Sequence, residues 1–239
     1  MMSFFYKGVC MFALKKVFAS LGMACFLMSS LPVEAEGIQL HRTRIVIDNG
    51  KNAGAYEVFN DHSTHTLIAT WVEDLNNEPS EAFVISPSIL QLAPRERGGG
   101  KIMKTGVLPT DRESVFWLAV KSIPSISKGQ EDISSATFSL VQKIKIFYRP
   151  KAVEQTTAYA AEYLEAHVIN GKLTLNNPSQ VSLSIPTVTV NGKECKIAAM
   201  LLPFSSESFD IAFTANDSLT YTYIDEYGGI VSKTKSGPF

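Results

Sequence analysis

Two runs of this sequence carry residue types that could bind a phosphate or a metal ion. Residues 98–101, Gly-Gly-Gly-Lys, resemble a phosphate-binding loop. They lack the spacing and the Ser or Thr of such a loop, and no helix pattern follows, so we interpret them as the tip of a hairpin. His62 and His65 have the spacing of metal ligands, but no second ligand pair follows at a zinc-site spacing. We therefore predict no metal and no cofactor.

Candidate nucleophiles are equally few. The sequence contains no G-x-S-x-G run and no Cys/His pair that its spacing would single out. Of three cysteines, Cys10 and Cys25 lie in a segment that we expect to be removed, which leaves Cys195 without a disulfide partner. A lone cysteine is more often a small buried apolar residue than a catalytic thiol. No enzyme signature therefore rises above background, although one sequence does not exclude catalytic residues dispersed along the chain.

The most informative run is residues 136–150. Apolar and polar side chains alternate along it, the pattern of a strand with two different faces. The run is about twice the usual strand length of five or six residues, and Pro150 ends it. A core strand needs no cations, yet Lys143, Lys145 and Arg149 lie near its end. Such a strand could serve its own sheet and a partner outside it.

The elements around this run are predicted to be strands. An opening run at residues 38–47, further β-rich runs up to residue 123 and frequent turn signals are typical of an immunoglobulin-like sandwich. Residues 151–161 read as a linker with a short helical turn. Strand and turn signals then resume, with Asn-Gly at residues 170–171 and 191–192. The sequence predicts an all-β protein with domains at residues 36–152 and 153–239.

Residues 1–35 have the features of a signal peptide. Lys15 and Lys16 precede an apolar run, and Val33-Glu34-Ala35 resembles a cleavage site. Either Met1 or Met11 could be the start. The alternative is a membrane anchor, although the apolar run is short for a span of about 20 residues. The remaining chain is slightly acidic, which does not suggest binding to nucleic acid or insertion in a membrane.

Four motifs, in order, resemble those of the periplasmic pilus-assembly chaperones. Residues 108–125 resemble the signature of that family, and residues 144–150 resemble the last strand of its first domain. Residues 43–46 and 223–229 also match. Ala119 departs from the pattern, because the family usually has Asn there.

The resemblance implies two immunoglobulin-like domains set in an L around a cleft, and a periplasmic, non-enzymatic role without a nucleotide. Such a chaperone binds pilus or fimbrial subunits that lack a strand, lends them its own strand and delivers them to an outer-membrane usher. Residues 125–135 form a short loop without cysteine, which resembles the short-loop subfamily. An alternative is an exported fimbrial structural or adhesive subunit. The alternating stripe at the end of the first domain and the basic residues favour the chaperone.

The resemblance also implies roles for particular residues. Arg44 and Lys145 match the two cations that hold the carboxyl terminus of the subunit, whereas by themselves both could be solvated strand cations. Three further residues match an interdomain charge cluster, namely Glu113, Arg149 and Glu226.

The donor-strand side chains are expected on the alternating stripe. Ala136, Phe138 and Leu140 would enter the groove of the subunit, with Ile144 and Ile146 nearer the cleft. Alternatively, Phe138 and Leu140 belong to the core of the domain itself. The exposed stripe could also let the free protein self-associate. Simple alternation places Lys145 on the opposite side from Ile144, which a bulge or a strong twist would reconcile.

Overall fold

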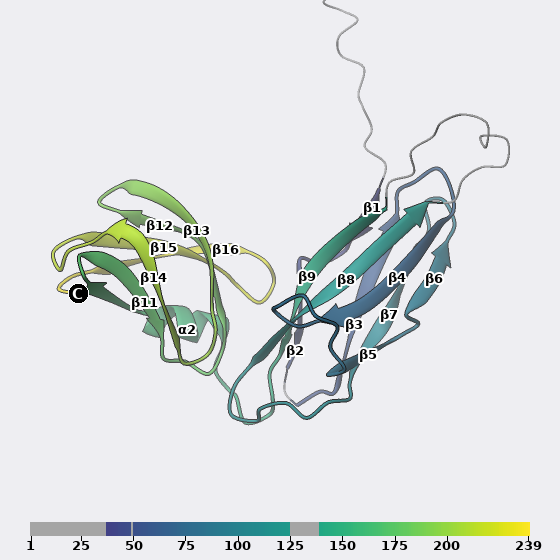
Figure 1. Cartoon of the computed structure of the whole chain (residues 1–239), viewed down its shortest axis with the longest axis horizontal. Coiled ribbons are helices and arrows are strands. Elements are labelled where there is room, and N and C mark those ends of the chain that lie inside the picture. The colour runs from purple at the N-terminus through teal and green to yellow at the C-terminus, as the bar shows by residue number, and fades with distance from the viewer. Residues whose placement is uncertain (1–36, 49, 125–138) are drawn as a thin grey trace, which may run out of the picture. The chain divides into compact units, whose positions relative to one another are not determined.

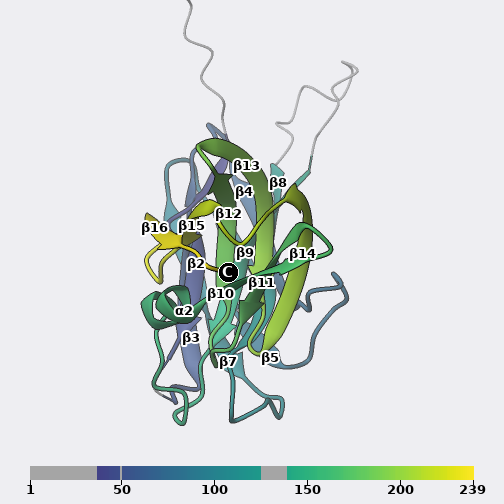
Figure 2. The same ribbon diagram turned by 90° about the vertical axis from the view of Figure 1, so that its left-hand side faces the viewer.

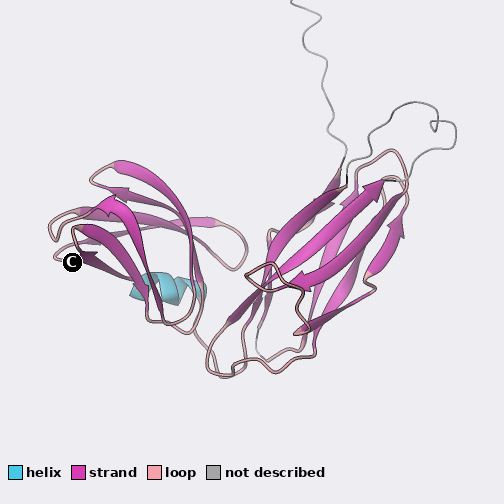
Figure 3. Ribbon diagram, viewed as in Figure 1, coloured by secondary structure: helices cyan, strands magenta, loops and turns pink. Residues whose placement is uncertain are grey.

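The computed structural model describes residues 37–48, 50–124 and 139–239. Almost all of their regular structure is strand, and α2 is the one helix in these ranges (Figure 3). No helix in the described residues is long and apolar enough to cross a membrane. The expected signal peptide and the donor residues Ala136 and Phe138 lie outside these ranges.

The first sandwich consists of a four-stranded and a five-stranded sheet (Figure 1). The four-stranded sheet has the order β1 (Ile38–Leu40), β3 (Ala53–Asn60), β7 (Arg97–Lys104) and β5 (Phe83–Ser86). The five-stranded sheet has the order β2 (Arg44–Ile47), β9 (Leu140–Tyr148), β8 (Ser114–Pro124), β4 (Thr66–Glu73) and β6 (Ile89–Leu92). Alternate side chains of both sheets face inward. Among the residues that they bury completely are Val58, Ile68, Ile102, Leu118 and Ile146.

The opening run of residues 38–47 is divided between the two sheets. β1 pairs antiparallel with β3, and β2 then pairs parallel with β9. A single strand over the whole run was expected, but alternation alone does not show where a chain passes from one sheet to the other. This change of sheet brings Arg44 beside the long strand.

The glycine run at residues 98–100 lies inside β7 and not at a hairpin tip, so that prediction was wrong. A Cβ on Gly99 would overlap the carbonyl oxygen of Tyr56, and one on Gly100 would lie 2.8 Å from the ring of Tyr56. These glycines therefore let β7 approach β3 and the Tyr56 ring closely, a use of strand glycines that the sequence pattern did not reveal.

The second sandwich also has two sheets, and its strands can be followed in Figure 2. The three-stranded sheet has the order β10 (Glu165–Ile169), β11 (Lys172–Asn177) and β14 (Ser205–Ala212). The four-stranded sheet has the order β13 (Lys193–Leu201), β12 (Leu183–Val190), β15 (Ser218–Ile224) and β16 (Ile230–Ser236). β16 was not predicted. Small polar and charged residues alternate along most of it, and the alternating large apolar residues that indicate a strand are missing there.

The helix α2 (Thr157–Tyr163) lies between the two sandwiches and ends two residues beyond the expected linker of residues 151–161. The Thr156 hydroxyl accepts a hydrogen bond of 3.1 Å from the Tyr159 amide and caps the first turn. Ala160 and Ala161 are fully buried in the second core, to which Val153 also belongs. Small side chains therefore let the helix pack closely on the second sandwich.

Candidate functional site

Arg44 and Lys145 lie opposite each other on the parallel strands β2 and β9. The β8–β9 ladder is continuous from Ser114↔Tyr148 to Ser122↔Leu140, so β9 has no bulge between Leu140 and Tyr148. Lys145 therefore faces outward, on the opposite side of the sheet from Ile144 and Ile146. The bulge that we considered is therefore absent from the described part of β9, and the two faces of this strand have different neighbours.

Within the described ranges, Lys145 has an aromatic neighbour and no acidic partner. Its Nζ lies 5.3 Å from the centroid of the Trp117 ring, a cation–π geometry. Among the described residues it forms no salt bridge. Burial, followed by the nearby charge of Arg44, lowers the pKa of Lys145 below its ordinary value. This ammonium group lacks a counter-ion in the part of the chain that the structure describes, and it favours the approach of an anion.

Lys143, two residues earlier on the same face, is paired instead. Its Nζ contacts a carboxylate oxygen of Glu73 and donates to Asn77 Oδ1 at 3.1 Å. The other carboxylate oxygen of Glu73 accepts a 2.6 Å hydrogen bond from the Trp71 indole. Lys143 therefore has an acidic partner in the fold. This contact distinguishes it from Lys145, whereas the sequence alone does not show which of the two lysines is available to a ligand.

Arg44 is 9% exposed and is held by the second sandwich. Its Nη1 donates to the carbonyl oxygens of Ile224 at 3.0 Å and Asp225 at 2.9 Å. Its guanidinium carbon lies 5.1 Å from the centroid of the Phe147 ring. Nε is buried and has no hydrogen-bond partner among the described residues. Burial is the main cause that lowers the pKa of Arg44.

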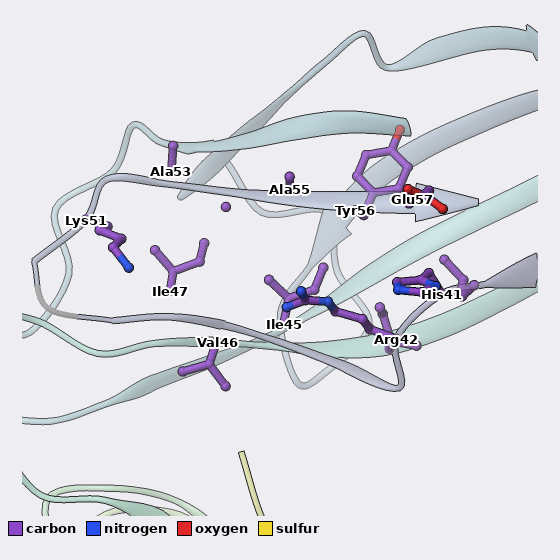
Figure 4. Close-up of a pocket in the computed structure, with 13 residues that line it drawn as sticks. His41, Arg42, Ile45, Val46, Ile47, Lys51, Ala53, Ala55, Tyr56 and Glu57 are labelled. Atoms are coloured by element: carbon purple, nitrogen blue, oxygen red, sulfur yellow. The ribbon is translucent and has the colours of Figure 1, made fainter. Parts of the chain in front are cut away.

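Hollows flank β2 on both sides. One has a volume of about 650 Å³ and is lined by the cations Arg42, Arg44 and Arg149 among others. The other, of about 480 Å³, lies between β2 and β3 (Figure 4). Figure 4 shows Ile45 and Ile47 pointing from β2 toward β3 and Val46 pointing away. The polar hollow thus adjoins Arg44, whereas the second hollow has an apolar floor.

The described part of the donor stripe is divided between core and surface. Ile146 is completely buried in the first core, and Ile144 packs partly against that core. Leu140, at the start of β9, is 55% exposed. Ile146 is therefore a core residue of the first sandwich, whereas Leu140 is accessible to a partner. Ala136 and Phe138 lie outside the described residues.

One edge of β9 is open over part of its length. β8 pairs with the whole strand, but β2 covers the other edge only from Lys145 to Tyr148. Among the described residues, no strand pairs with that edge between Leu140 and Ile144. The Gln142 side chain reaches across it to the carbonyl of Ile38 at 2.9 Å. The open edge can therefore accept an added strand that ends beside Arg44.

The structure brings Glu113, Arg149 and Glu226 together. Nε and Nη2 of Arg149 donate to Glu113 Oε2 at 3.1 and 2.9 Å, and Nη1 lies 3.4 Å from Glu226 Oε1. The other oxygen of Glu113 accepts from the Ser182 amide at 2.9 Å. Arg149 and Glu113 are buried, so water screens their charges only slightly. The cluster therefore connects the two sandwiches through a buried ion pair.

Glu226 also caps the connecting helix. Its Oε1 accepts a 2.7 Å hydrogen bond from the Thr157 amide, at the first residue of α2. Burial alone would raise the pKa of Glu226, but this hydrogen bond and the charge of Arg149 outweigh it, so the pKa lies below its ordinary value. The carboxylate thus joins the helix, Arg149 and the β15–β16 turn.

Sequence reasoning missed several groups at this site. They are the Trp117 ring beside Lys145, the Glu73 carboxylate beside Lys143 and the two carbonyls that hold Arg44. Trp117 and Glu73 depend on strand register, which one sequence does not fix. For the two carbonyls, the available signal in the sequence was the Gly228-Gly229 pair, which indicates a turn directly after Ile224 and Asp225.

His62 and His65 follow β3, and no group of three metal-ligand residues occurs in the described ranges.

Comparison with known proteins gives two consecutive family matches. Residues 37–154 match the model described as pili and flagellar-assembly chaperone, PapD N-terminal domain. Residues 159–235 match the model described as pili assembly chaperone PapD, C-terminal domain.

Similar proteins agree with these matches. The probable fimbrial chaperone LpfB of Escherichia coli O157:H7 is 32% identical over 190 residues, which cover 79% of this chain and 81% of LpfB. The chaperone protein FocC of Escherichia coli is 29% identical over 210 residues, with 86% and 92% covered. The crystal structure of the E. coli chaperone DraB has a TM-score of 0.75 and 26% identity, covering 86% of this chain and all of DraB.

Proposed function

Because this chain belongs to the family of pilus-assembly chaperones, we propose that it captures fimbrial subunits in the periplasm through β9 and delivers them to an outer-membrane usher. The family and the relatives favour a chaperone over a fimbrial structural or adhesive subunit. The finer assignments below are the mechanism that we infer for this chain.

The open edge of β9 is the observation that carries the proposal. A subunit strand added between Leu140 and Ile144 would lie in line with β2, which occupies the same edge from Lys145 onward. If that strand runs parallel to β9, its carboxyl terminus arrives beside Arg44 and Lys145. Strand addition satisfies the unpaired backbone groups of both chains.

The two cations would fix the position of the added strand. Charge-assisted hydrogen bonds to a carboxylate contribute about 1.5–3 kcal/mol each. The anchor also defines the register, which an apolar stripe alone would leave free to shift by two residues. Lys145 supports this role because no acidic residue pairs with it in the described ranges.

The apolar part of the contact would continue the core of the first sandwich. Leu140 shares a face of β9 with Ile144 and Ile146, and it lies where that core ends. Covering Leu140 with the groove of a subunit would contribute roughly 1.5–3 kcal/mol. Ala136 and Phe138 remain candidates for the next pockets along the chain.

The site is suited to binding and not to a chemical transformation. Its groups are a guanidinium, an ammonium and an apolar strand edge, which recognise an anion and a strand. We infer a non-enzymatic mechanism in which the subunit is exchanged without nucleotide hydrolysis. Purified chaperone and subunit are therefore expected to form their complex without added ATP, and a nucleotide requirement would contradict this.

The usher is proposed to contact the outer face of the five-stranded sheet. Leu67 is 40% exposed and Ile89 60% exposed, and strand pairing places both on the same face as Ile123. Exposed apolar side chains that lie together commonly mark interaction surfaces. Ile89→Asp is expected to stop fibre assembly while subunit capture persists. Normal fibre formation by this variant would exclude the patch.

The free protein is proposed to self-associate through the same open edge. Leu140 and the 40% exposed Val141 would otherwise remain in water. Sedimentation velocity is expected to show a concentration-dependent dimer that a bound subunit dissociates. A monomer at all concentrations would refute this part.

Co-expression with a fimbrial subunit encoded near the chaperone tests the proposal. Lys145→Met is expected to remove the complex and leave the subunit to aggregate or be degraded. The control, Lys101→Met, removes an exposed lysine from β7 in the opposite sheet and should preserve the complex. Equal recovery of subunit with both variants would refute the anchoring role of Lys145.

A further inference from the structure

The turn between β15 and β16 is closed by one carboxylate. Asp225 Oδ1 accepts hydrogen bonds from the amides of Tyr227 at 2.9 Å and Gly229 at 2.7 Å. The Gly228 amide also donates to the Asp225 carbonyl at 3.2 Å. The Asp225 amide in turn donates to the Gly229 carbonyl at 2.9 Å, so four local hydrogen bonds define the shape of this turn.

This turn packs against the residues that begin β2. The backbone φ of Gly228 is +91°, which L residues rarely adopt. A Cβ at Gly228 would overlap the hydroxyl of Thr43, the residue before Arg44. Only glycine therefore allows the turn to come this close, and the approach delivers the carbonyls of Ile224 and Asp225 to Arg44.

Both carbonyls bind the same nitrogen of Arg44. Nη1 donates to each of them, whereas Nε is buried and has no partner among the described residues, and none of their hydrogen bonds uses Nη2. An arginine held in this way keeps Nε and Nη2 out of its hydrogen bonds to the turn, and these two nitrogens together can bind a carboxylate through two parallel hydrogen bonds. A buried donor without a partner is costly, so an arriving acceptor removes an existing penalty.

We propose that the Ile224–Gly229 turn is a positioning element that orients the Nε–Nη2 edge of Arg44 toward the carboxyl terminus of the captured subunit. This inference rests on the proposed function and deepens it. It assigns Gly228 and Asp225 to subunit capture, although neither would touch the subunit. It also makes one element of the second sandwich necessary for an anchor on the first.

The test uses a fluorescent peptide with the sequence of the last strand of the subunit, prepared with a free carboxylate and as the amide. Fluorescence anisotropy gives the preference of the full chaperone for the acid over the amide. For the wild type we expect a preference of about 10- to 150-fold, the equivalent of about 1.5–3 kcal/mol.

Gly228→Ala is expected to reduce this preference about tenfold, because the turn must move away from Thr43 and Arg44. Gly192→Ala is the matched control. Gly192 also has a positive φ, +82°, in a hairpin turn of the second sandwich, but nothing lies within 4 Å of its added Cβ. The control should incur the same kind of backbone strain and keep the wild-type preference.

Asp225 gives a second pair of variants that does not depend on the folding of Gly228→Ala. Asp225→Asn keeps an oxygen that can close the turn, whereas Asp225→Ala removes it. Loss of a negative charge near Arg44 should by itself strengthen carboxylate binding in both variants. The positioning role instead predicts a reduced acid preference for Asp225→Ala and an unchanged or larger one for Asp225→Asn.

The possible results separate the two claims. If the wild type binds acid and amide equally, the carboxylate anchor fails and the positioning role fails with it. If the wild type prefers the acid and Gly228→Ala and Asp225→Ala do so equally, only the positioning role is refuted. A reduced preference in Asp225→Ala alone, with Asp225→Asn unchanged, supports the inference even if Gly228→Ala does not fold.

Discussion

Arg44 and Lys145 are directly opposite each other on parallel neighbouring strands, and neither forms a salt bridge among the described residues. Placing two cations side by side on a partly buried face lowers the pKa of Lys145 through burial and then through the charge of Arg44. In the free protein this arrangement is unfavourable. A negatively charged ligand would relieve it, which is why the pair suits a carboxylate.

The first prediction follows from the lowered pKa of Lys145. The folded state releases this proton at a lower pH than the unfolded state, whose lysines titrate near pH 10.4. In the window between those two values the unfolded state binds more protons, so this group makes stability rise with pH. Lys145→Met removes the effect. We expect the variant to be more stable than the wild type near pH 7, with a difference that shrinks toward pH 10.

Denaturant unfolding of both proteins across that pH range measures the difference. Lys101→Met controls for the loss of an exposed lysine. Parallel stability profiles for the wild type and Lys145→Met would contradict the assigned environment of Lys145.

The second prediction separates surface from core along β9. Ile146→Ala deletes a completely buried side chain and is expected to cost about 2–5 kcal/mol of unfolding free energy. Leu140→Ala changes a side chain that is 55% exposed and should cost no more than about 0.5 kcal/mol while weakening subunit capture. Equal losses of stability would mean that Leu140 belongs to the core of the domain.

The third prediction concerns the buried cluster. Arg149→Ala leaves the Glu113 carboxylate buried without its cation, a loss of about 3–5 kcal/mol in comparable pairs. We expect looser domains in small-angle scattering and lower periplasmic abundance, with each sandwich still folded. Arg112→Ala breaks an exposed pair with Asp111 and should leave stability close to that of the wild type, because water screens such pairs. A wild-type scattering profile for Arg149→Ala would remove the structural role of the cluster.

The fourth prediction concerns export, and its residues lie outside the described ranges. Cleavage after Ala35 should give a mature protein that begins at Glu36 and is recovered from the periplasm. Intact-mass spectrometry of the purified protein measures its amino terminus. A retained leader, or a lipid on Cys25, would require the membrane-anchored alternative.

The sequence by itself determined the strand content, the two-sandwich organisation and the family. Alternation and turn residues are local signals. They predict strands at residues 53–60, 66–73 and 218–224, and these are the ranges of β3, β4 and β15. Motif matches also singled out Arg44 and Lys145, which are paired on β2 and β9, and the three members of the charge cluster, which lie within contact distance of one another. The division of residues 38–47 between two sheets and the strand formed by the glycine run were not predicted, because both depend on neighbours distant in sequence.

Tertiary structure alone decided which of these residues are available. Lys143 and Lys145 are two residues apart on one face. Strand pairing places Trp117 between Lys145 and Glu73, and the Glu73 carboxylate contacts Lys143 instead. Leu140 and Ile146 share one alternating stripe, but the core ends between them. The orientation of Arg44 comes from carbonyls about 180 residues away. Contacts of this kind depend on packing between strands far apart in the chain, which local sequence patterns do not encode.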